Sequence, residues 1–500
     1  MKKTLLRAAF AAMIIALLSS CVSTSKADKV EGEAVSKSAA KEAKTAKSKS
    51  VKEPKVSKKK FDEKAYAAAY EKGDYTACAS MLLGRNVKKD VIKDMLDADM
   101  LMYNSEMYKS SGKGFLETYG LMQQSSAQLN AGEALKASLS VETNTNYGGA
   151  EYERYLAWSM RLACALNLDQ EDVANGIMKD YIGTFMDEIQ ALRELNDQVE
   201  KGSEIALESD EFKSAQQKLS SSGINFSFVE RPKKSSVRYE TSPFFNYLGT
   251  LSYAANGDFD HAQQFADVYK VPKASELVSV PADKGRLEIV ALTGLIGQRE
   301  DVSAGRDPEK FVLHLNDIKR DVPIYTKITY PIFNPASQTS KITAVRISLS
   351  DGQYAPAVLI EDFDKAVAID VAQKAYGAYS RSVFRNVVKN AIVVGSVIGA
   401  AVAVQQAAKL NALAAVAADI GLNTAIQIAA GAVAKIEKAD TRQGIYFPNK
   451  ASAAGFVVEP GTYSVKVEYL SGSSVVETKT IENIVVKPGK VTARVSSCQK

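Results

Sequence analysis

The sequence contains few of the side chains on which catalysis and metal binding most often depend. Its 500 residues include one Trp and two His, His261 and His314, which are far apart in the chain. It has no His-Glu-x-x-His and no Gly-x-Ser-x-Gly, and Gly112-Lys113-Gly114 lacks the upstream glycine of a phosphate-binding loop. We therefore expect no enzymatic activity, no cofactor and no metal site. Carboxylates are numerous, so a cell-wall or glycan-acting enzyme with an acidic pair stays an alternative.

Cysteine is also scarce, and its four residues are too far apart for a disulfide framework or a Cys-x-x-Cys metal site. Cys78 and Cys164 lie in apolar helical surroundings, where a free cysteine is usually a small buried hydrophobic side chain. A bridge between these two thiols is the alternative in an oxidising compartment.

Positive charge is concentrated in one segment. The net charge is +5 and 24% of the residues are charged, but much of the Lys excess lies between Val22 and Lys60. The rest of the chain is near neutral and gives no indication of a nucleic-acid partner. With 46% hydrophobic residues the composition is that of a globular protein, and 500 residues are enough for two or three domains.

The apolar run at the N-terminus is too short to span a membrane. Ala8–Leu18 follows a basic start and falls well short of the ~20 residues that a spanning helix needs. Residues 1–20 have the pattern of a secretory signal peptide. Leu18-Ser19-Ser20-Cys21 resembles the lipobox of bacterial lipoproteins, which implies cleavage before Cys21 and attachment of diacylglycerol to its thiol. An ordinary signal peptide with a chance cysteine, or an uncleaved anchor, is the alternative.

The anchor also predicts where the protein is held. Val22 stands where an Asp would favour retention in the inner membrane of proteobacteria, so we expect the outer membrane, facing the periplasm or the cell surface. Residues 21–60 are rich in Lys, Ser and Ala and have no aromatic residue, which predicts a disordered tether behind the lipidated cysteine. A flexible coil of this length averages roughly 35 Å from end to end.

Between residues 61 and 272 the apolar period is helical, and short breaks divide it into hairpins. The breaks are Gly73-Asp74-Tyr75, Asn167-Leu168-Asp169 and Gly257-Asp258-Phe259. This pattern resembles tetratricopeptide (TPR) hairpins, so we expect a TPR-like helical domain whose concave face binds a partner. An irregular helical domain packed on itself is the alternative. Ser220–Ser242 predicts a long loop before the last hairpin.

The pattern then changes to short strands. Residues 285–362 and 443–496 are expected to form a β-sandwich-like domain or a small barrel. Ser350-Asp351-Gly352 predicts a hairpin turn. The expected strands are Arg286–Leu292, Phe311–Leu315, Ile324–Tyr330, Ile342–Leu349, Ala355–Ile360, Gly444–Phe447, Ala453–Val458, Tyr463–Tyr469, Val475–Val486 and Val491–Val495.

Residues 363–438 interrupt the β part and are expected to form an Ala/Gly-rich helical hairpin. Ala391–Val404 is strongly apolar and carries a Gly-x-x-x-Gly spacing at Gly395 and Gly399, which is typical of helix pairs in membranes. Polar residues end this run too soon for a membrane span. We therefore favour a buried pairing with Leu410–Ile436 over membrane insertion, which stays the alternative.

A row of basic residues is the clearest candidate for an anion site. Arg381, Arg385 and Lys389 recur every four residues and so line one helix face. Such a row is usually solvated or paired with carboxylates, and an anionic ligand is the sharper alternative.

A set of short segments gives the chain a family resemblance. They are Tyr152-Glu153-Arg154, Phe244-Phe245-Asn246-Tyr247-Leu248, Gly257-Asp258, Arg381–Lys389, Ala439-Asp440-Thr441-Arg442, Pro448 and Glu459-Pro460-Gly461-Thr462-Tyr463. From Phe61 to Val495 the chain loosely resembles a little-characterised family of bacterial envelope lipoproteins, which implies a TPR-like helical half followed by a β half. Some relatives are encoded beside lipoproteins that resemble the curli secretion channel and a penicillin-binding-protein activator. That implies envelope assembly or secretion by association, and no active site is carried over.

The predicted fold class is α+β and multidomain, with an N-terminal TPR-like solenoid and a C-terminal β-sandwich-like domain that the helical hairpin interrupts. These features favour a lipid-anchored, non-enzymatic protein-interaction or scaffold module of the cell envelope. The expected partners are a membrane, through the lipid on Cys21, and an envelope protein, through the helical domain. A membrane-inserting component of an envelope or secretion complex is the alternative.

Overall fold

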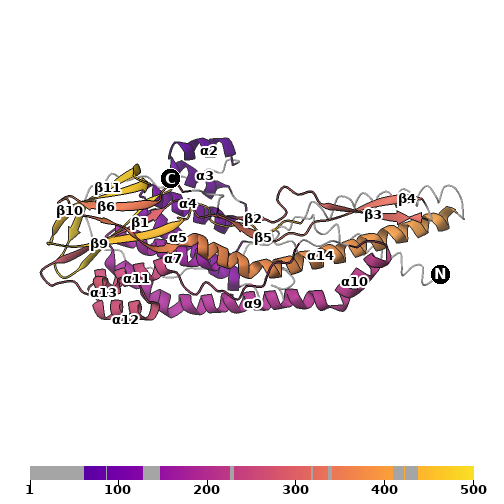
Figure 1. Cartoon of the computed structure of the whole chain (residues 1–500), viewed down its shortest axis with the longest axis horizontal. Coiled ribbons are helices and arrows are strands. Elements are labelled where there is room, and N and C mark those ends of the chain that lie inside the picture. Colours follow the sequence, from indigo (N-terminus) through magenta and orange to yellow (C-terminus); the bar gives the residue numbers. More distant parts are fainter. Residues whose placement is uncertain are drawn as a thin grey trace, which may run out of the picture. The chain divides into compact units, whose positions relative to one another are not determined.

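The structure, a computed structural model, describes residues 61–85, 87–127, 147–225, 230–316, 319–335, 340–408, 422 and 437–500. The predicted lipid anchor at Cys21 and the predicted tether of residues 21–60 lie outside these ranges. The described chain combines helices with several sheets (Figure 1), which confirms the predicted α+β class.

The first part of the chain consists mainly of antiparallel helix pairs. Its helices are α2 (Glu63–Glu71), α3 (Tyr75–Gly84), α4 (Val91–Asn104), α5 (Tyr108–Ala127), α7 (Glu151–Asn167), α8 (Glu171–Asp180), α11 (Pro243–Ala255), α12 (Phe259–Tyr269) and the short α13 (Ala274–Leu277). The three predicted hairpins are present as α2–α3, α7–α8 and α11–α12.

Each predicted break turns through one residue with a left-handed backbone. Gly73 and Gly257 have φ angles of 73° and 82°, which glycine adopts without steric cost, and Asp169 has a φ of 54°. Asp74 and Asp258 then cap the following helices, because their carboxylates accept hydrogen bonds from backbone N–H groups of the first turn. The Gly-Asp pair therefore both ends one helix and starts the next.

Aromatic side chains fill the space between the helices. Tyr155, Trp158, Tyr181, Phe185 and Phe245 are each at most 2% exposed. The centroids of neighbouring rings lie 4.3 to 6.5 Å apart, close to or within the range of favourable aromatic pairs. Burying each such ring contributes roughly 1.5–3 kcal/mol, so this cluster is a main source of stability for the helical part.

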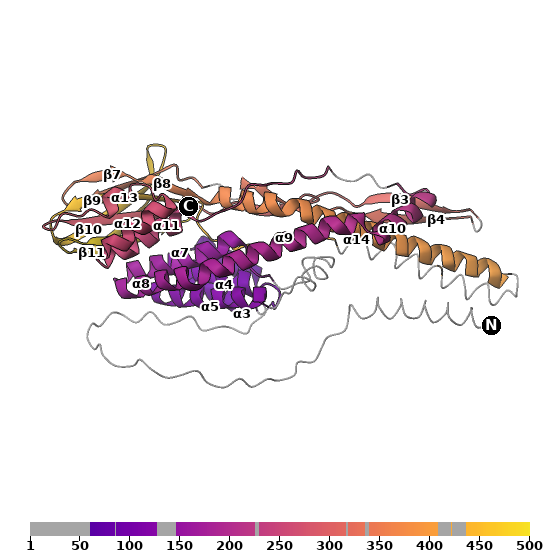
Figure 2. The same cartoon turned by 90° about the horizontal axis from the view of Figure 1, so that it is seen from below.

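Two long helices run side by side (Figure 1 and Figure 2). One is α9 (Met186–Glu208), which follows a π-helical turn at Tyr181–Phe185 and leads into α10 (Asp210–Ser221). The other is α14 (Phe363–Ala408), which begins where the helical insertion was predicted. The predicted second helix of that insertion, Leu410–Ile436, lies outside the described residues except for Leu422.

The apolar half of α14 packs on α10, and the predicted partner segment Leu410–Ile436 lies outside the described residues except for Leu422, which shares the same buried cluster. A Cβ built on Gly395 would lie 2.1 Å from Lys218 Nζ, so this glycine of the Gly-x-x-x-Gly pair makes room for a lysine of α10. Among the described helices, one segment, Phe363–Gln406, is long and apolar enough to cross a membrane, and 33% of its most apolar window is buried.

Two four-stranded sheets form the C-terminal β part. Their strands are β1 (Gly285–Thr293), β6 (Ala344–Leu349), β7 (Tyr354–Pro356), β8 (Val358–Asp362), β9 (Lys450–Val458), β10 (Gly461–Ser471), β11 (Ser474–Val486) and β12 (Val491–Cys498). One sheet has the order β12-β1-β9-β8, with β1 parallel to β12, and the other has the order β11-β10-β6-β7. Apolar side chains of both sheets share one buried cluster, and Ser350-Asp351-Gly352 joins β6 to β7 as predicted.

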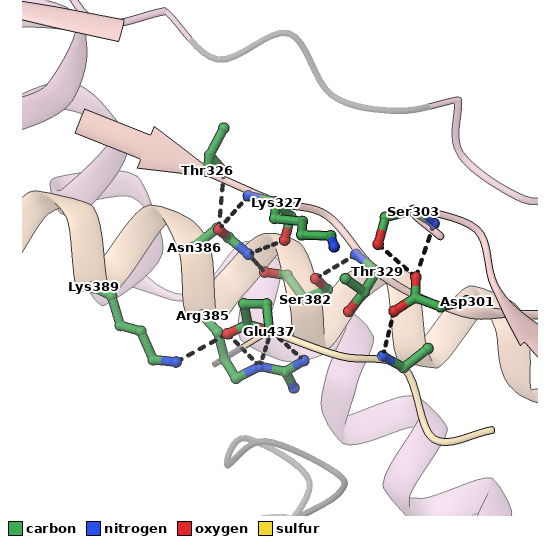
Figure 3. Close-up of polar contacts among 11 residues, drawn as sticks. Asp301, Ser303, Thr326, Lys327, Thr329, Ser382, Arg385, Asn386, Lys389 and Glu437 are labelled. Atoms are coloured by element: carbon green, nitrogen blue, oxygen red, sulfur yellow. Dashed lines mark hydrogen bonds and ion pairs between the residues drawn. The ribbon is translucent and has the colours of Figure 1, made fainter. Parts of the chain in front are cut away.

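Four shorter strands form two separate pairs. They are β2 (Gln298–Asp301) with β5 (Pro331–Asn334), and β3 (Glu309–Leu315) with β4 (Arg320–Thr326). The strand predicted at Ile324–Tyr330 ends at Thr326, and α14 supplies the physical reason (Figure 3). The Asn386 side chain binds both backbone groups of Lys327, and Ser382 Oγ accepts from Thr329 N–H, so these groups are satisfied without a strand partner.

The strand predicted at Gly444–Phe447 is wrong, because this segment forms bends. Gly444 N–H donates to Glu153 Oε1 on α7 at 2.7 Å, and Ile445 N–H donates to Asp97 Oδ1 on α4 at 2.6 Å. Both carboxylates are buried. They take the place of the neighbouring strand that the backbone would otherwise need.

The helices and the first sheet share one hydrophobic cluster and are joined by polar contacts at its edge. Tyr103 O–H on α4 donates to the Val495 carbonyl of β12 at 2.8 Å. Arg494 of β12 binds both carboxylate oxygens of Asp169, after α7, at 2.7 Å. The sheet therefore fixes the positions of the helices packed against it.

Candidate functional site

The basic row on α14 is divided between two environments. Arg385 binds the Glu437 carboxylate through Nη2 at 2.9 Å and Nε at 3.1 Å, and Lys389 Nζ binds its other oxygen at 2.9 Å (Figure 3). The side chains of Arg385 and Glu437 are 3% and 0% exposed. The expected pairing of the basic row with a carboxylate is therefore confirmed for Arg385 and Lys389.

Arg381, the third residue of the row, lies apart from this pair. Its Nη1 donates to Ser203 Oγ of α9 at 3.1 Å. It also lines a cleft of about 1130 Å³ between α9 and α14, which is the candidate site of this protein.

The other residues that the sequence singled out do not form a site. His261 Nδ1 lies 2.8 Å from Asp258 on α12, and His314 Nδ1 lies 2.7 Å from Asp321 across the β3–β4 pair. Gly112-Lys113-Gly114 lies inside α5. Within the described ranges no group of three His, Cys, Asp or Glu residues is placed to hold a metal ion. The described cysteines, Cys78, Cys164 and Cys498, are buried and unbridged.

The cleft is lined by charged residues of both signs. Its walls come from α9, from α14, from residues 147–151 at the start of α7, and from the extended segment 230–242, which we call the strap. The strap forms neither helix nor strand. The described residues that line the cleft include no His and no Cys.

The strap is held against α9 by ion pairs. Arg238 binds Asp197 through both carboxylate oxygens at 2.7 and 2.8 Å, and Lys234 pairs with Glu204. Arg193 Nη2 of α9 donates to the backbone carbonyl oxygens of Tyr239 and Glu240, over 2.8 and 2.9 Å. Each of these contacts uses a side chain of α9. The position of this part of the strap therefore depends on the charged residues of that helix.

A buried carboxylate anchors the C-terminal end of the strap. Glu361 of β8 accepts from Tyr239 O–H and Ser242 O–H at 2.6 Å and from Phe244 N–H at 2.8 Å. Burial raises the pKa of Glu361 to about 6, although these donors favour its charged form. The C-terminal end of the strap is therefore fixed. Its middle rests on exposed ion pairs with α9 and on cation–π contacts of Arg231 and Lys234 with Tyr376 of α14.

Deeper in the cleft, a second group of charged residues forms ion pairs. Arg299 Nη2 and Lys374 Nζ bind the two carboxylate oxygens of Asp370, each at 2.7 Å. Burial alone would raise the pKa of Asp370, but Lys374 and Arg299 outweigh it and hold that pKa below its ordinary value. Glu151 and Arg193 form another pair at the side.

One carboxylate of the cleft differs from the others. Glu200 Oε1 is buried and accepts no hydrogen bond from the described residues. Burial raises the pKa of Glu200, and Lys234 partly offsets this effect. The opposite wall is Gly377 of α14, where a Cβ would stand 3.5 Å from Glu200 Cγ, so the glycine leaves space beside this acid.

Most acids of the cleft are paired with bases. Apart from Glu200, the acids of the cleft described above, Glu151, Asp197, Glu204 and Asp370, are engaged with bases. No protein-family model matches the chain, and neither the characterised proteins nor the solved structures compared with it give a significant match.

Sequence reasoning missed the cleft because its two walls are far apart in the chain. One signal was present: Asp197, Glu200 and Glu204 are spaced to share one face of a helix. Lys234 and Arg238 follow in a segment that was predicted only as a loop. Opposite charge in two neighbouring segments was the available clue to their contact.

Proposed function

We propose that this protein is a lipid-anchored protein of the cell envelope that binds a partner protein and acts as a scaffold, without catalysis. The observation that carries the proposal is the cleft between α9 and α14. Its volume of about 1130 Å³ suits a segment of polypeptide, and its charges are arranged for ionic recognition.

Sequence features support the location and the architecture in this proposal. The lipobox-like Leu18-Ser19-Ser20-Cys21 would anchor the protein at the outer membrane, and residues 21–60 would let the folded part reach a partner. The pairs α2–α3, α7–α8 and α11–α12 would be TPR-like units, which commonly bind proteins. The two four-stranded sheets would form a β-sandwich-like support for them.

In-cell photo-crosslinking tests the proposal. A photoreactive residue is placed at Gln373, which lines the cleft, and a matched one at Leu116, which is 50% exposed on α5. We expect one envelope protein to be crosslinked from position 373 and not from position 116. Cys21→Ala should release the protein from the detergent phase and weaken that crosslink. The same products from both positions, or none from position 373, would refute a partner in the cleft.

A second candidate is a membrane-inserting component, and α14 provides the observation that favours it. Ile392, Ile398 and Val402 are 48%, 38% and 44% exposed on its apolar half. Single cysteines at position 398 and at the exposed position 116 can be compared in liposomes with a water-soluble thiol label. Protection of position 398 alone would support insertion, and equal labelling would exclude it.

A further inference from the structure

We propose that the strap is a displaceable occupant of the cleft, and that the natural ligand is an extended basic peptide of a partner protein. This inference rests on the proposed binding function and names the chemistry of the partner. The ligand would carry two basic side chains four residues apart, as the strap does at Lys234 and Arg238.

The alignment of the strap with α9 explains why two basic side chains four residues apart fit the acidic residues of this helix. Arg238 pairs with Asp197 and Lys234 pairs with Glu204, so the strap runs antiparallel to the helix. Four residues of extended chain cover roughly 13 Å. Seven residues of helix rise about 10.5 Å, so the two pairs of charges meet without bending either backbone.

The third acid of the same helix face is the place that the strap does not satisfy. Glu200 lies between Asp197 and Glu204 on this face of α9, and its Oε1 accepts no hydrogen bond from the described chain. A buried carboxylate oxygen without a donor is unfavourable. A ligand that brings an N–H group or an ammonium group to Glu200 would therefore bind better than the strap does.

A second unsatisfied atom lines the same cleft and has the opposite requirement. Arg299 has 6% of its side chain exposed, and its Nε is buried without an acceptor in the described part of the chain. Glu200 needs a donor and Arg299 needs an acceptor. A polypeptide backbone offers both groups at every residue, which a metal ion or an inorganic anion does not.

The contacts of the strap are of the kind that exchange easily. The side chains of Arg238 and Asp197 are 43% and 53% exposed, and those of Lys234 and Glu204 are 56% and 32% exposed. Ion pairs so open to water are weak and are screened by salt. The buried contacts of Tyr239 and Ser242 with Glu361 keep the strap near its place when its middle is displaced.

A binding experiment with the strap's own sequence tests the inference on the full mature protein in detergent. The probe is a fluorescent peptide of residues 230–242, Glu-Arg-Pro-Lys-Lys-Ser-Ser-Val-Arg-Tyr-Glu-Thr-Ser. The double variant Lys234→Glu/Arg238→Glu should expel the middle of the strap from α9. We expect it to bind the peptide at least tenfold more tightly than the wild type, with an affinity that falls as salt rises.

Two controls decide whether the acidic face of α9 is the site. Adding Asp197→Asn and Glu204→Gln to the double variant should abolish peptide binding. Lys113→Glu, which changes an exposed pair on α5, should leave the wild-type affinity unchanged. Equal binding by wild type and double variant, or binding that survives neutralisation of α9, would overturn the inference.

A second measurement covers the case in which the double variant does not fold. A photoreactive group replaces the residue equivalent to Lys234 in the peptide, and the peptide is added in excess to the wild-type protein. We expect crosslinks within residues 196–204 of α9 or at Tyr376 of α14, which lies 5.7 Å from Lys234 Nζ, and crosslinks elsewhere would refute the site. In-cell crosslinking from position 373 is an independent measurement, so a failure of this inference is distinguishable from a failure of the proposed function.

Discussion

Tyr239 donates its hydroxyl hydrogen to Glu361 Oε1 over 2.6 Å, and this bond ties the strap to β8. The same carboxylate also accepts from Ser242 O–H and Phe244 N–H, where α11 begins. One buried acid therefore joins the wall of the cleft, the start of a helix and an edge strand of the first sheet. A change in the protonation state of Glu361 should therefore affect the stability of the strap, the start of α11 and β8.

The first prediction concerns the pH dependence of stability. Burial raises the pKa of Glu361 from 4.5 to about 6. The folded protein therefore holds this proton more tightly than the unfolded chain, so the stabilisation is present below pH 4.5 and is lost as the pH rises through 6. The difference between these two pKa values corresponds to about 2 kcal/mol.

Glu361→Gln removes this titration and keeps an oxygen that can accept from Ser242 and Phe244. We expect the free energy of unfolding of the variant, relative to wild type, to rise by about 2 kcal/mol between pH 4.5 and pH 7. Urea unfolding at several pH values measures the difference. Glu117→Gln, at an exposed position on α5, is the control and should show no such trend. A flat difference for Glu361→Gln would contradict the prediction.

The second prediction compares two glycines of α5. A Cβ on Gly114 would lie 1.9 Å from Asp99 Oδ1, whereas a Cβ on Gly120 meets nothing within 4 Å. Asp99 is buried and accepts from Thr118 O–H at 2.8 Å, so moving its carboxylate away from Gly114 would break this hydrogen bond or disturb the packing around it. Gly114→Ala should lower the free energy of unfolding by about 1–3 kcal/mol through overpacking.

Gly120→Ala should instead raise the free energy of unfolding by roughly 0.4–1 kcal/mol, because alanine lowers the entropy of the unfolded chain. The opposite signs on one helix separate packing from helix propensity. In the double variant Asp99→Ala/Gly114→Ala the clash is absent. Its loss of stability should therefore be smaller than the sum of the losses in Asp99→Ala and Gly114→Ala. Thermal or urea unfolding is measured for Gly114→Ala, Gly120→Ala, Asp99→Ala and the double variant. Equal effects at the two glycines would refute the close approach of Asp99.

The third prediction uses the two basic residues that share Glu437. Arg385 is buried with its carboxylate, whereas Lys389 is 36% exposed. Arg385→Ala leaves a buried charge without its main partner and should cost about 3–5 kcal/mol. Lys389→Ala should cost less than about 1 kcal/mol, because its ammonium is already hydrated. Both losses are measured by urea unfolding. A loss for Arg385→Ala as small as that for Lys389→Ala would show that Glu437 is more hydrated than its burial indicates.

Local sequence signals predicted the elements that depend on local chemistry. The Gly-Asp breaks gave the hairpins α2–α3 and α11–α12, because a left-handed glycine and a capping carboxylate act within one turn of chain. The turn at Ser350-Asp351-Gly352 was found for the same reason. The parallel pairing of β1 with β12 was not anticipated, since it joins strands from opposite ends of the β part and no local pattern encodes it.

The errors and omissions share a physical cause. Gly444–Phe447 has the composition of a strand, but Glu153 and Asp97 satisfy its backbone from helices more than 250 residues earlier. The strand predicted at Ile324–Tyr330 stops early because Asn386 competes for its backbone. The cleft was missed because α9 and α14 meet only in the folded chain. Buried polar partners across long chain distances are the information that periodicity does not contain.

The last prediction concerns the cysteines. Burial raises the pKa of Cys78 to about 11 and that of Cys164 to about 12, and it also raises the pKa of Cys498. Since the thiolate is the reactive form, these thiols should not react with a water-soluble maleimide in the native protein at pH 7.5. After unfolding in urea without reductant, all three should be labelled, as counted by mass spectrometry. Labelling of Cys498 alone after unfolding would reveal a bridge between Cys78 and Cys164, and fast labelling before unfolding would contradict their burial.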